Sequence, residues 1–447
     1  MSNEYINKLG QKIAEGEIIT EDNLNDLQNF RISYATPLSE TFQEITRISD
    51  KIHRASIVAF RLKRIGTIIN KMKRMPKLKL SRMGDVAGIR CIFYNTNEVY
   101  KFVELIKNDF IIKGKIRDYI KYPKEIGYKA VHLHIQDKKT GKIIELQVRT
   151  LEFHNWATLI EITDFLYSLR LKELGFNSNQ KFAEFHSLLS SDKDLTESEA
   201  NLIYEILNER DFILTLSDTF RKNSKHVKKQ WLGLKRNDSF HLITAKKEDI
   251  PKIESFNNFE KAEAAYYEKY KQDNEAEIVL TYIRKPNFQQ ISIAYANYIL
   301  SYHTFMRDIE PILEQLAIDA IEDKNFKKFR NIFLTYEKLQ VSLTLNFLSD
   351  SAELIFSRLE KRKILITKGK SLSRSQEKKI RDNLNETYRE KNIKYQEFIG
   401  EVYQKLPANR FMKYLFKNFL KKHNKRVVKI LKNQNIVFED LKENEIE

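Results

Sequence analysis

The chain has 447 residues, enough for two or three domains, and its 42% of hydrophobic residues exclude a disordered protein. Its single cysteine, Cys91, excludes a disulfide framework and a thiolate zinc site within one chain. The net charge of +17 favours polyanionic partners, namely nucleotides, RNA or DNA. No apolar stretch approaches the roughly 20 residues that span a bilayer, and the first residues contain no signal-peptide core. We therefore expect a cytoplasmic protein with no membrane partner.

The basic residues are concentrated in two regions. Between Arg54 and Arg90 there are 11 basic residues and one acid, Asp85. Lys361–Glu447 contains 23 Lys and Arg against 11 Asp and Glu, a net charge of +12. For this C-terminal region a set of solvated helix faces is an equally good interpretation, because a run of charge alone is weak evidence of binding.

The N-terminal part of the chain is predicted to be helical. Residues 1–30 should form one or two short helices. From Pro37 to Met75 apolar residues recur at spacings of three and four, which predicts two further helices. The second covers Ile57–Met75, carries Arg61, Lys63 and Lys71, and ends at Pro76.

A mixed α/β layer is predicted between residues 83 and 150. Gly84 and Gly88 frame Asp85 and allow the backbone to approach a ligand closely. A helix over Asn97–Asn108 and a basic, aromatic loop over Asp118–Tyr128 connect the strands. The four predicted strands lie within Met83–Tyr94, Ile111–Asp118, Tyr128–Ile135 and Ile143–Arg149.

The last of these strands has two different faces. Ile144, Leu146 and Val148 should point into a core, and the alternate residues, Glu145, Gln147 and Arg149, away from it. A carboxylate, an amide and a guanidinium in one row are costly to bury without partners, which favours a wet or ligand-filled cleft. A half-exposed edge strand is the alternative. Thr150 then caps a helix to about Lys172, with His154, Thr158 and Glu161 on one face.

The rest of the chain is predicted to hold a second, smaller α/β unit followed by helices. Strands are expected at Ser239–Lys246 and Glu277–Arg284, and helices at Thr196–Arg221, Phe259–Gln272 and Ile291–Leu300. We expect four parts: an N-terminal helical segment (1–30), a mixed α/β domain (31–192), a helix with the small α/β unit (193–300) and a basic helical region (301–447).

Five ordered motifs fall within roughly 100 residues: Arg61-Leu-Lys63 with Thr67–Lys71; Asp85–Arg90; Asp118–Lys124; Gly127–His132; and Glu145–Thr150 with His154–Ala157. Together they resemble the synthetase domain of the RelA/SpoT family, which moves the β,γ-pyrophosphate of ATP to a ribose 3′-hydroxyl. The resemblance covers about residues 30–190. It implies a mixed-sheet, nucleotidyltransferase-like fold flanked by helices.

The resemblance also implies roles for individual residues. Asp85 and Glu145 would be the catalytic acids and would bind Mg²⁺, with Glu145 alternatively the general base on the 3′-hydroxyl. Tyr128 would stack on the acceptor base. ATP would be bound by Arg61, Lys63, Lys71 and Arg90. The acceptor and the transferring phosphates would be positioned by Lys124, His132, Gln147, Arg149 and His154.

Each of these residues also has a plain structural interpretation. The lysines would suit a solvated helix face, Tyr128 a core position at a strand start, and His132 a partly buried strand position. Two departures from the family pattern concern the acceptor side. Ile126 stands where many members have Asn, and the helix after Trp156 has no histidine where many have Glu-His.

Three functions remain open at this level. The first is synthesis of (p)ppGpp from ATP and GDP or GTP. The second keeps the reaction but uses the 3′ end of tRNA, as toxic small relatives do, and implies an antitoxin or regulatory partner. The third is an inactive nucleotide or RNA-binding regulator, which the joint retention of Asp85, Glu145, Arg90 and Tyr128 disfavours. No His-Asp dipeptide occurs among the nine histidines, so we expect no hydrolase activity. Small relatives often assemble, so a homo-oligomer is also considered.

Overall fold

The computed structural model describes residues 2–54, 56–167, 169, 171–191, 194–209, 212–213, 230–231, 234, 238–245, 252–272, 276–284, 302–361, 375, 393, 395–407 and 410–432. The chain forms two compact units. One comprises residues 1–191 and 222–301, and the other residues 192–221 and 302–447.

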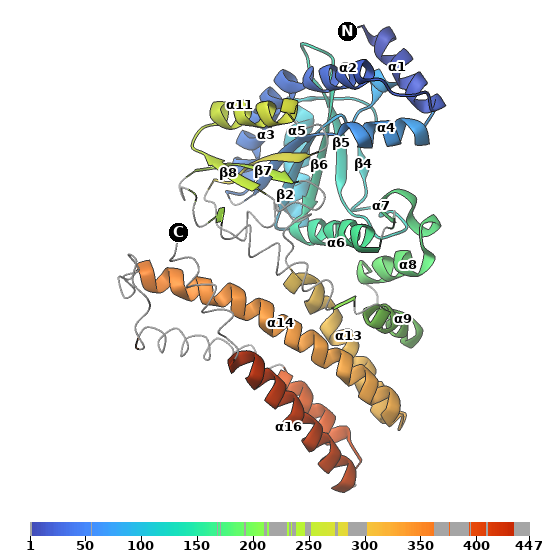
Figure 1. Cartoon of the computed structure of the whole chain (residues 1–447), viewed down its shortest axis with the longest axis vertical. Helices are drawn as coiled ribbons and strands as arrows, with labels where there is room; N and C mark the ends of the chain where they lie inside the picture. The colour runs from blue at the N-terminus through green and yellow to red at the C-terminus, as the bar shows by residue number, and fades with distance from the viewer. Residues whose placement is uncertain are drawn as a thin grey trace. The chain divides into compact units, whose positions relative to one another are not determined.

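The first unit is built on a mixed sheet that has nine strands among the described residues (Figure 1). Their order is β3-β5-β6-β2-β1-β9-β7-β8, and β4 pairs with β5. The β2–β6 pair is parallel, and the other described pairs are antiparallel. The strands are β1 (Ile57–Leu62), β2 (Ala87–Phe93), β3 (Ile111–Ile112), β4 (Arg117–Asp118), β5 (Val131–Gln136), β6 (Ile143–Thr150), β7 (Phe240–Ala245), β8 (Lys252–Phe256) and β9 (Glu277–Tyr282).

Helices of the first unit supply the other half of its core. Phe42, Phe60 and Phe259 are in ring contact, which joins a helix before the sheet, a central strand and a helix far along the chain. The large buried hydrophobic cluster on this side of the sheet includes Ile89, Leu133 and Leu146. The helices are α1 (Asn3–Glu15), α2 (Glu21–Ile32), α3 (Ala35–Ile52), α4 (Ile65–Arg74), η1 (Leu80–Arg82), α5 (Thr96–Asp109), α6 (Leu151–Tyr167), α7 (Leu171–Leu174), η2 (Gly175–Asn177), α8 (Gln180–Leu189) and α11 (Phe259–Gln272).

The prediction of one helix over Ile57–Met75 is wrong. The segment forms strand β1, then helix α4, so Arg61 lies on a strand and Lys63 in the connection. β1 pairs with β2 on one side and β9 on the other, and its first four residues are all buried. A strand buried on both faces shows a continuous apolar run instead of alternation, which periodicity cannot distinguish from a helix.

Three other differences from the prediction concern strands, and a fourth concerns a helix. The strand expected over Ile111–Asp118 is two short strands, β3 and β4. Strand β8 was not predicted. The strands of the small α/β unit extend the main sheet, because β9 pairs with β1. The helix expected over Thr196–Arg221 ends at Asn208, and the residues beyond it are largely outside the described ranges, as is the helix expected at residues 291–300. The boundaries of the four predicted parts stay a prediction.

The second unit is helical, as predicted for its described residues. Its helices are α9 (Glu197–Asn208), α13 (Tyr302–Glu322), α14 (Phe326–Lys361) and α16 (Arg410–Lys432), and residues 395–405 are also helical. α13 and α14 pack closely on each other. Within the described ranges, none of the helices combines the length and apolar composition needed to cross a bilayer.

Candidate active site

Polar side chains collect on one face of the sheet, where β5, β6, β2 and β1 lie side by side. Along β6 the buried Ile144, Leu146 and Val148 alternate with Glu145, Gln147 and Arg149, as the sequence predicts. Cross-strand pairs share a face of the sheet. The pairs are His132 with Gln147, His134 with Glu145, Arg90 with Gln147, and Gly88 with Glu145 and Arg61. We call this surface the polar face: Arg61, Arg90, His132, His134, Glu145, Gln147 and Arg149.

Asp85 lies in the turn before β2 and is held by two lysines. Its Oδ2 accepts hydrogen bonds from Lys63 Nζ at 2.8 Å and from Lys71 Nζ at 2.7 Å. Burial alone would raise the pKa of Asp85, but the two ammonium groups hold its pKa below the ordinary value. Asp85 Oδ1 is buried and has no hydrogen-bond partner in the described part of the chain. Its lone pairs are therefore open to a cation or a donor.

A chain of hydrogen bonds runs from Tyr128 through His132 to Glu145. Tyr128 Oη lies 2.8 Å from His132 Nε2, and His132 Nδ1 lies 3.1 Å from Glu145 Oε1. Gln147 Nε2 donates to Glu145 Oε2 at 2.9 Å. Burial alone would raise the pKa of Glu145, but hydrogen bonds from His132 and Gln147 lower this pKa to about 2. The expected acceptor tyrosine and the second expected acid are thus physically linked.

The arginines give the polar face a positive region. Arg149 is 3% exposed, and its Nη2 lies 2.6 Å from Nδ1 of the fully buried His154 on α6. Burial, with added repulsion from Arg90, lowers the pKa of Arg149 to about 9. Arg149 Nε is buried with no hydrogen-bond partner among the described residues. Guanidinium groups match the oxygens of a phosphate well, so this region suits phosphate groups.

The loop between β4 and β5 presents Lys124 and Tyr128 beside the polar face. Lys124 Nζ lies 4.9 Å from the ring centre of Tyr119 and 5.2 Å from that of Tyr128. Gly127 has a φ of 87°, and a Cβ there would lie 1.7 Å from Ser190 Oγ. Only glycine fits that position without displacing the chain, so the end of α8 rests directly on this loop.

His186 of α8 lies behind the same loop. It is fully buried, and neither ring nitrogen has a hydrogen-bond partner within the described ranges. Its backbone oxygen accepts a hydrogen bond from Trp156 Nε1 at 3.0 Å. Burial lowers the pKa of His186 to about 3. The folded protein therefore keeps this imidazole neutral where the unfolded chain would protonate it.

His186→Phe should remove an acid sensitivity of the fold. The unfolded histidine takes up a proton near pH 6.5, whereas the folded one, with a pKa of about 3, does not, so stability falls as pH drops below 6.5. Between pH 7 and pH 5 the free energy of unfolding should fall by about 2 kcal/mol more in the wild type than in the variant. Urea unfolding at both pH values measures this, and an equal pH dependence would contradict it.

All twelve residues expected from the sequence lie in the first unit, and eleven of them fall into three groups. Lys63, Lys71 and Asp85 form the ion-pair cluster, and Lys124 and Tyr128 share the loop. Most of the rest line the polar face: Arg61, Arg90, His132, Glu145, Gln147 and Arg149. His154 does not line the polar face, because it is buried behind Arg149. The helix that carries it, α6, covers Leu151–Tyr167 and does not reach Lys172 as predicted.

His134 also lies on the polar face and was not among the residues expected from the sequence. A Cβ on Gly84 would lie 3.0 Å from its ring, so it packs on the turn that carries Asp85. Burial lowers the pKa of His134, while the charges of Glu145 and Asp85 both raise that pKa, so His134 is close to both acids. The alternation in residues 131–136, with His132 and His134 on one side, was the signal that could have revealed it.

The carboxylates can hold a magnesium ion only together with other ligands. Among the described residues, no three His, Cys, Asp or Glu side chains gather into a metal-binding group. Mg²⁺ commonly takes one or two carboxylates and completes its shell with phosphates and water. Asp85 Oδ1, buried without a partner, suits such a ligand. Glu145 keeps further lone pairs beside its two hydrogen bonds.

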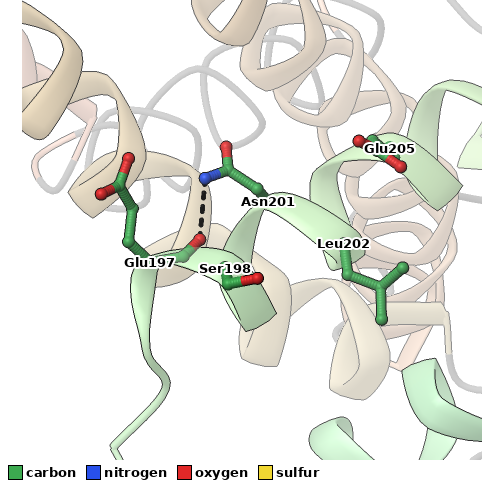
Figure 2. Close-up of a pocket in the computed structure, with 5 residues that line it drawn as sticks. All are labelled: Glu197, Ser198, Asn201, Leu202 and Glu205. Atoms are coloured by element: carbon green, nitrogen blue, oxygen red, sulfur yellow. Dashed lines mark hydrogen bonds between the residues drawn. The ribbon is translucent and has the colours of Figure 1, made fainter.

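A surface depression of about 480 Å³ belongs to the second unit and is a different feature. Figure 2 shows that Glu197, Ser198, Asn201, Leu202 and Glu205, all on α9, line it. Its two carboxylates and the absence of a cationic side chain from this lining make it unsuited to a phosphate. It contains none of the residues expected from the sequence.

Comparison with known proteins places all twelve residues in one family region. Residues 60–168 match the "Region found in RelA / SpoT proteins". The small alarmone synthetase 1 of Bacillus subtilis, solved bound to its product pppGpp, is similar in structure, with 22% identity and a TM-score of 0.33. That match covers 42% of this chain and 97% of the solved chain.

Curated relatives match the same part of the chain. GTP pyrophosphokinase YwaC of Bacillus subtilis is 28% identical over 156 residues, which are 32% of this chain and 74% of the relative. GTP pyrophosphokinase YjbM of the same organism is 31% identical over 150 residues, which are 31% of this chain and 70% of the relative. With this identity over more than two thirds of YjbM and with the family region in residues 60–168, the chain belongs to the RelA/SpoT family and carries its synthetase domain.

Proposed function

We propose that this protein is an ATP-dependent pyrophosphokinase that makes (p)ppGpp from GDP or GTP. The observation that supports this most strongly is the joint placement of the Asp85–Lys63–Lys71 cluster, Glu145 and the arginines around one face of the sheet. Two relatives similar to this domain are GTP pyrophosphokinases. No hydrolase activity is proposed.

The ATP side of the reaction would use the cluster and two arginines of the polar face, Arg61 and Arg90. Asp85 Oδ1 would bind Mg²⁺, which would neutralise phosphate charge when bound. Lys63 and Lys71 already lie within 2.8 Å of the other Asp85 oxygen, and would face the triphosphate. Arg61 and Arg90 would hold the adenine between them. These assignments are supported by charge and position together.

The acceptor side would use the loop and the far part of the polar face. Tyr128 would stack on the guanine base, with Lys124 beside it. His132, Gln147 and Arg149 would position the ribose and phosphates, and His154 would act only through Arg149. The acceptor 3′-oxygen forms a bond to the β-phosphorus of ATP, the bond to the α-phosphate oxygen breaks, and AMP leaves. The hydroxyl proton is lost to solvent or to a base, for which Glu145 is one candidate.

A label-transfer experiment tests the proposal. The protein is incubated with Mg²⁺ and γ-labelled ATP, and separately with GDP, GTP or bulk tRNA. We expect the label to appear in a guanosine tetra- or pentaphosphate, with one AMP formed for each transfer. Label that enters tRNA alone would favour the second candidate below, and no transfer to any acceptor would overturn the proposal.

Tyr128→Ala should weaken the acceptor much more than ATP. A stacked base is worth roughly 1–3 kcal/mol, so KM for GDP or GTP should rise about 5- to 150-fold. Tyr128→Phe keeps the ring and loses only the hydrogen bond to His132, so its effect should be mild. Steady-state kinetics with each substrate varied in turn measures both. An equal loss for the two substrates would identify Tyr128 as a structural residue.

Transfer to the 3′ end of tRNA is the second candidate, and the surface of α16 favours it. Lys421, Lys422 and Lys425 are exposed on this helix at spacings that place them on one flank. Phe411 and Tyr414, about two to four turns earlier on the same helix, are 63% and 61% exposed. Exposed cations beside exposed rings suit a nucleic-acid backbone and its bases. A free nucleotide would need no such surface.

Changing Lys421, Lys422 and Lys425 to Glu separates the two acceptors. A tRNA reaction should lose at least tenfold in kcat/KM at low salt and become less salt-dependent, because fewer counterions are released on binding. Turnover with GDP or GTP should stay within twofold. The matched control changes three exposed lysines of the first unit, Lys101, Lys107 and Lys113. If the α16 variant leaves tRNA transfer and its salt dependence unchanged, the surface has no part in acceptor binding.

A further inference from the structure

Two tyrosine hydroxyls of α11 take the place of a missing strand partner at the end of β1. The pairing of β1 with β9 covers Val58 to Phe60 and stops two residues before Leu62. The Leu62 backbone N–H donates instead to Tyr266 Oη at 2.9 Å. Tyr270 Oη donates to the Lys63 backbone oxygen at 3.2 Å. The N–H of Leu62 and the backbone oxygen of Lys63 are therefore both bonded to α11, a helix about 200 residues later in the chain.

The two tyrosines are themselves held rigidly. Tyr266 and Tyr270 are 0% and 1% exposed, and their rings stack with centroids 5.7 Å apart. The fully buried Arg31 of α2 lies over the ring of Tyr270 at 4.1 Å. Gln28 Nε2 donates to the Tyr270 backbone oxygen at 2.7 Å. The ring of Tyr270 is thus in contact with both Tyr266 and Arg31, which limits where its hydroxyl can lie.

We propose that Tyr266 and Tyr270 are positioning residues for the ATP-binding half of the site. The step is short: the hydroxyls fix the backbone of Leu62 and Lys63, and Lys63 Nζ in turn lies 2.8 Å from Asp85. α11 lies outside residues 60–168, so this support comes from a part of the chain beyond the family region (Figure 1). The inference rests on the proposed use of Lys63 in ATP binding.

Removing single hydroxyls tests this with a matched control on the same helix. Tyr270→Phe and Tyr266→Phe remove the bonds to Lys63 and Leu62. Tyr267→Phe removes a hydroxyl that donates to the Ala35 backbone oxygen at 3.0 Å and lies 3.4 Å from Ser39 Oγ, and both of these partners belong to α3. The measurements are the midpoint of urea unfolding, the Kd of a non-hydrolysable ATP analogue with Mg²⁺, and KM and kcat for ATP and for the acceptor.

Tyr270→Phe should raise the Kd of the analogue roughly three- to tenfold and leave KM for the acceptor unchanged. Both variants lose one hydrogen bond, so Tyr267→Phe should lower the midpoint of urea unfolding about as much as Tyr270→Phe does. It should leave the Kd of the analogue and the KM for the acceptor unchanged. The inference would be overturned if Tyr270→Phe lost affinity for both substrates in parallel, or if it bound the analogue as the wild type does. It would also be overturned if Tyr267→Phe showed the same loss of affinity, or if the wild type did not bind the analogue. If Tyr266→Phe does not fold, Tyr270→Phe still decides. A wild type that binds the analogue but transfers no label would refute the proposed function while the binding comparison still tests the inference.

Discussion

Asp85→Asn should lower the rate of pyrophosphate transfer by about a thousandfold or more. The amide has the shape of the carboxylate but cannot balance the charges of Lys63 and Lys71, and it is a poor ligand for Mg²⁺. A thousandfold loss corresponds to about 4 kcal/mol of transition-state stabilisation, which is within the range expected for a group that organises phosphoryl charge. The transfer of label from ATP to the acceptor, followed over time, measures the loss.

The control for this variant must separate chemistry from folding. Asp109→Asn removes the same charge from an exposed residue at the end of α5 and should be silent. Asp85→Asn leaves two partly buried ammonium groups without their shared counter-charge, so its free energy of unfolding should fall by about 1–3 kcal/mol. Both proteins are therefore assayed at a temperature where unfolding curves show them to be folded. Turnover within tenfold of the wild type would remove Asp85 from the active site.

The part of the polar face that lies on β5 and β6 was open to prediction because side chains in a strand alternate strictly. That Glu145, Gln147 and Arg149 share one side of β6 can be predicted without knowing the neighbouring strands. The same holds for His132 and His134, which share one side of β5. β1 was not predictable in the same way. Its apolar run is buried on both faces, and only its partners β2 and β9 distinguish it from a helix.

The contacts that set the site depend on pairing between distant segments. The family motifs indicate that Lys63, Lys71 and Asp85 share a site, but not that both lysines bond the same carboxylate oxygen. Residues 240–282 were predicted to form a separate small unit, whereas β9 pairs with β1 of the main sheet. Local sequence patterns carry no information on which strand β9 pairs with. The bond from Tyr270 to Lys63 spans 207 positions, and no periodicity within either segment predicts it.

The second acid can be a metal ligand or a general base, and we propose the first. Glu145 has a pKa of about 2 because His132 and Gln147 bond its two oxygens against the effect of burial. It therefore stays anionic at working pH. A carboxylate with such a pKa is a weak base, since general bases work best when their pKa is near the working pH. A fixed anion with spare lone pairs suits a cation better.

Glu145→Gln should accordingly weaken Mg²⁺-dependent ATP binding as well as chemistry. The amide keeps the size of the side chain but loses the charge, and its NH2 group cannot accept the hydrogen bond that one of the two carboxylate oxygens receives from His132 or Gln147. We expect the Kd of a non-hydrolysable ATP analogue to rise at least tenfold with Mg²⁺ present and to change little with EDTA, and kcat/KM to fall about 100- to 1,000-fold. Titration calorimetry with and without the metal gives the first pair of values, and label transfer gives the last. A variant that binds the analogue as the wild type does, in the presence of Mg²⁺, yet loses kcat would assign Glu145 to proton removal from the 3′-hydroxyl and leave Asp85 as the carboxylate that holds the metal.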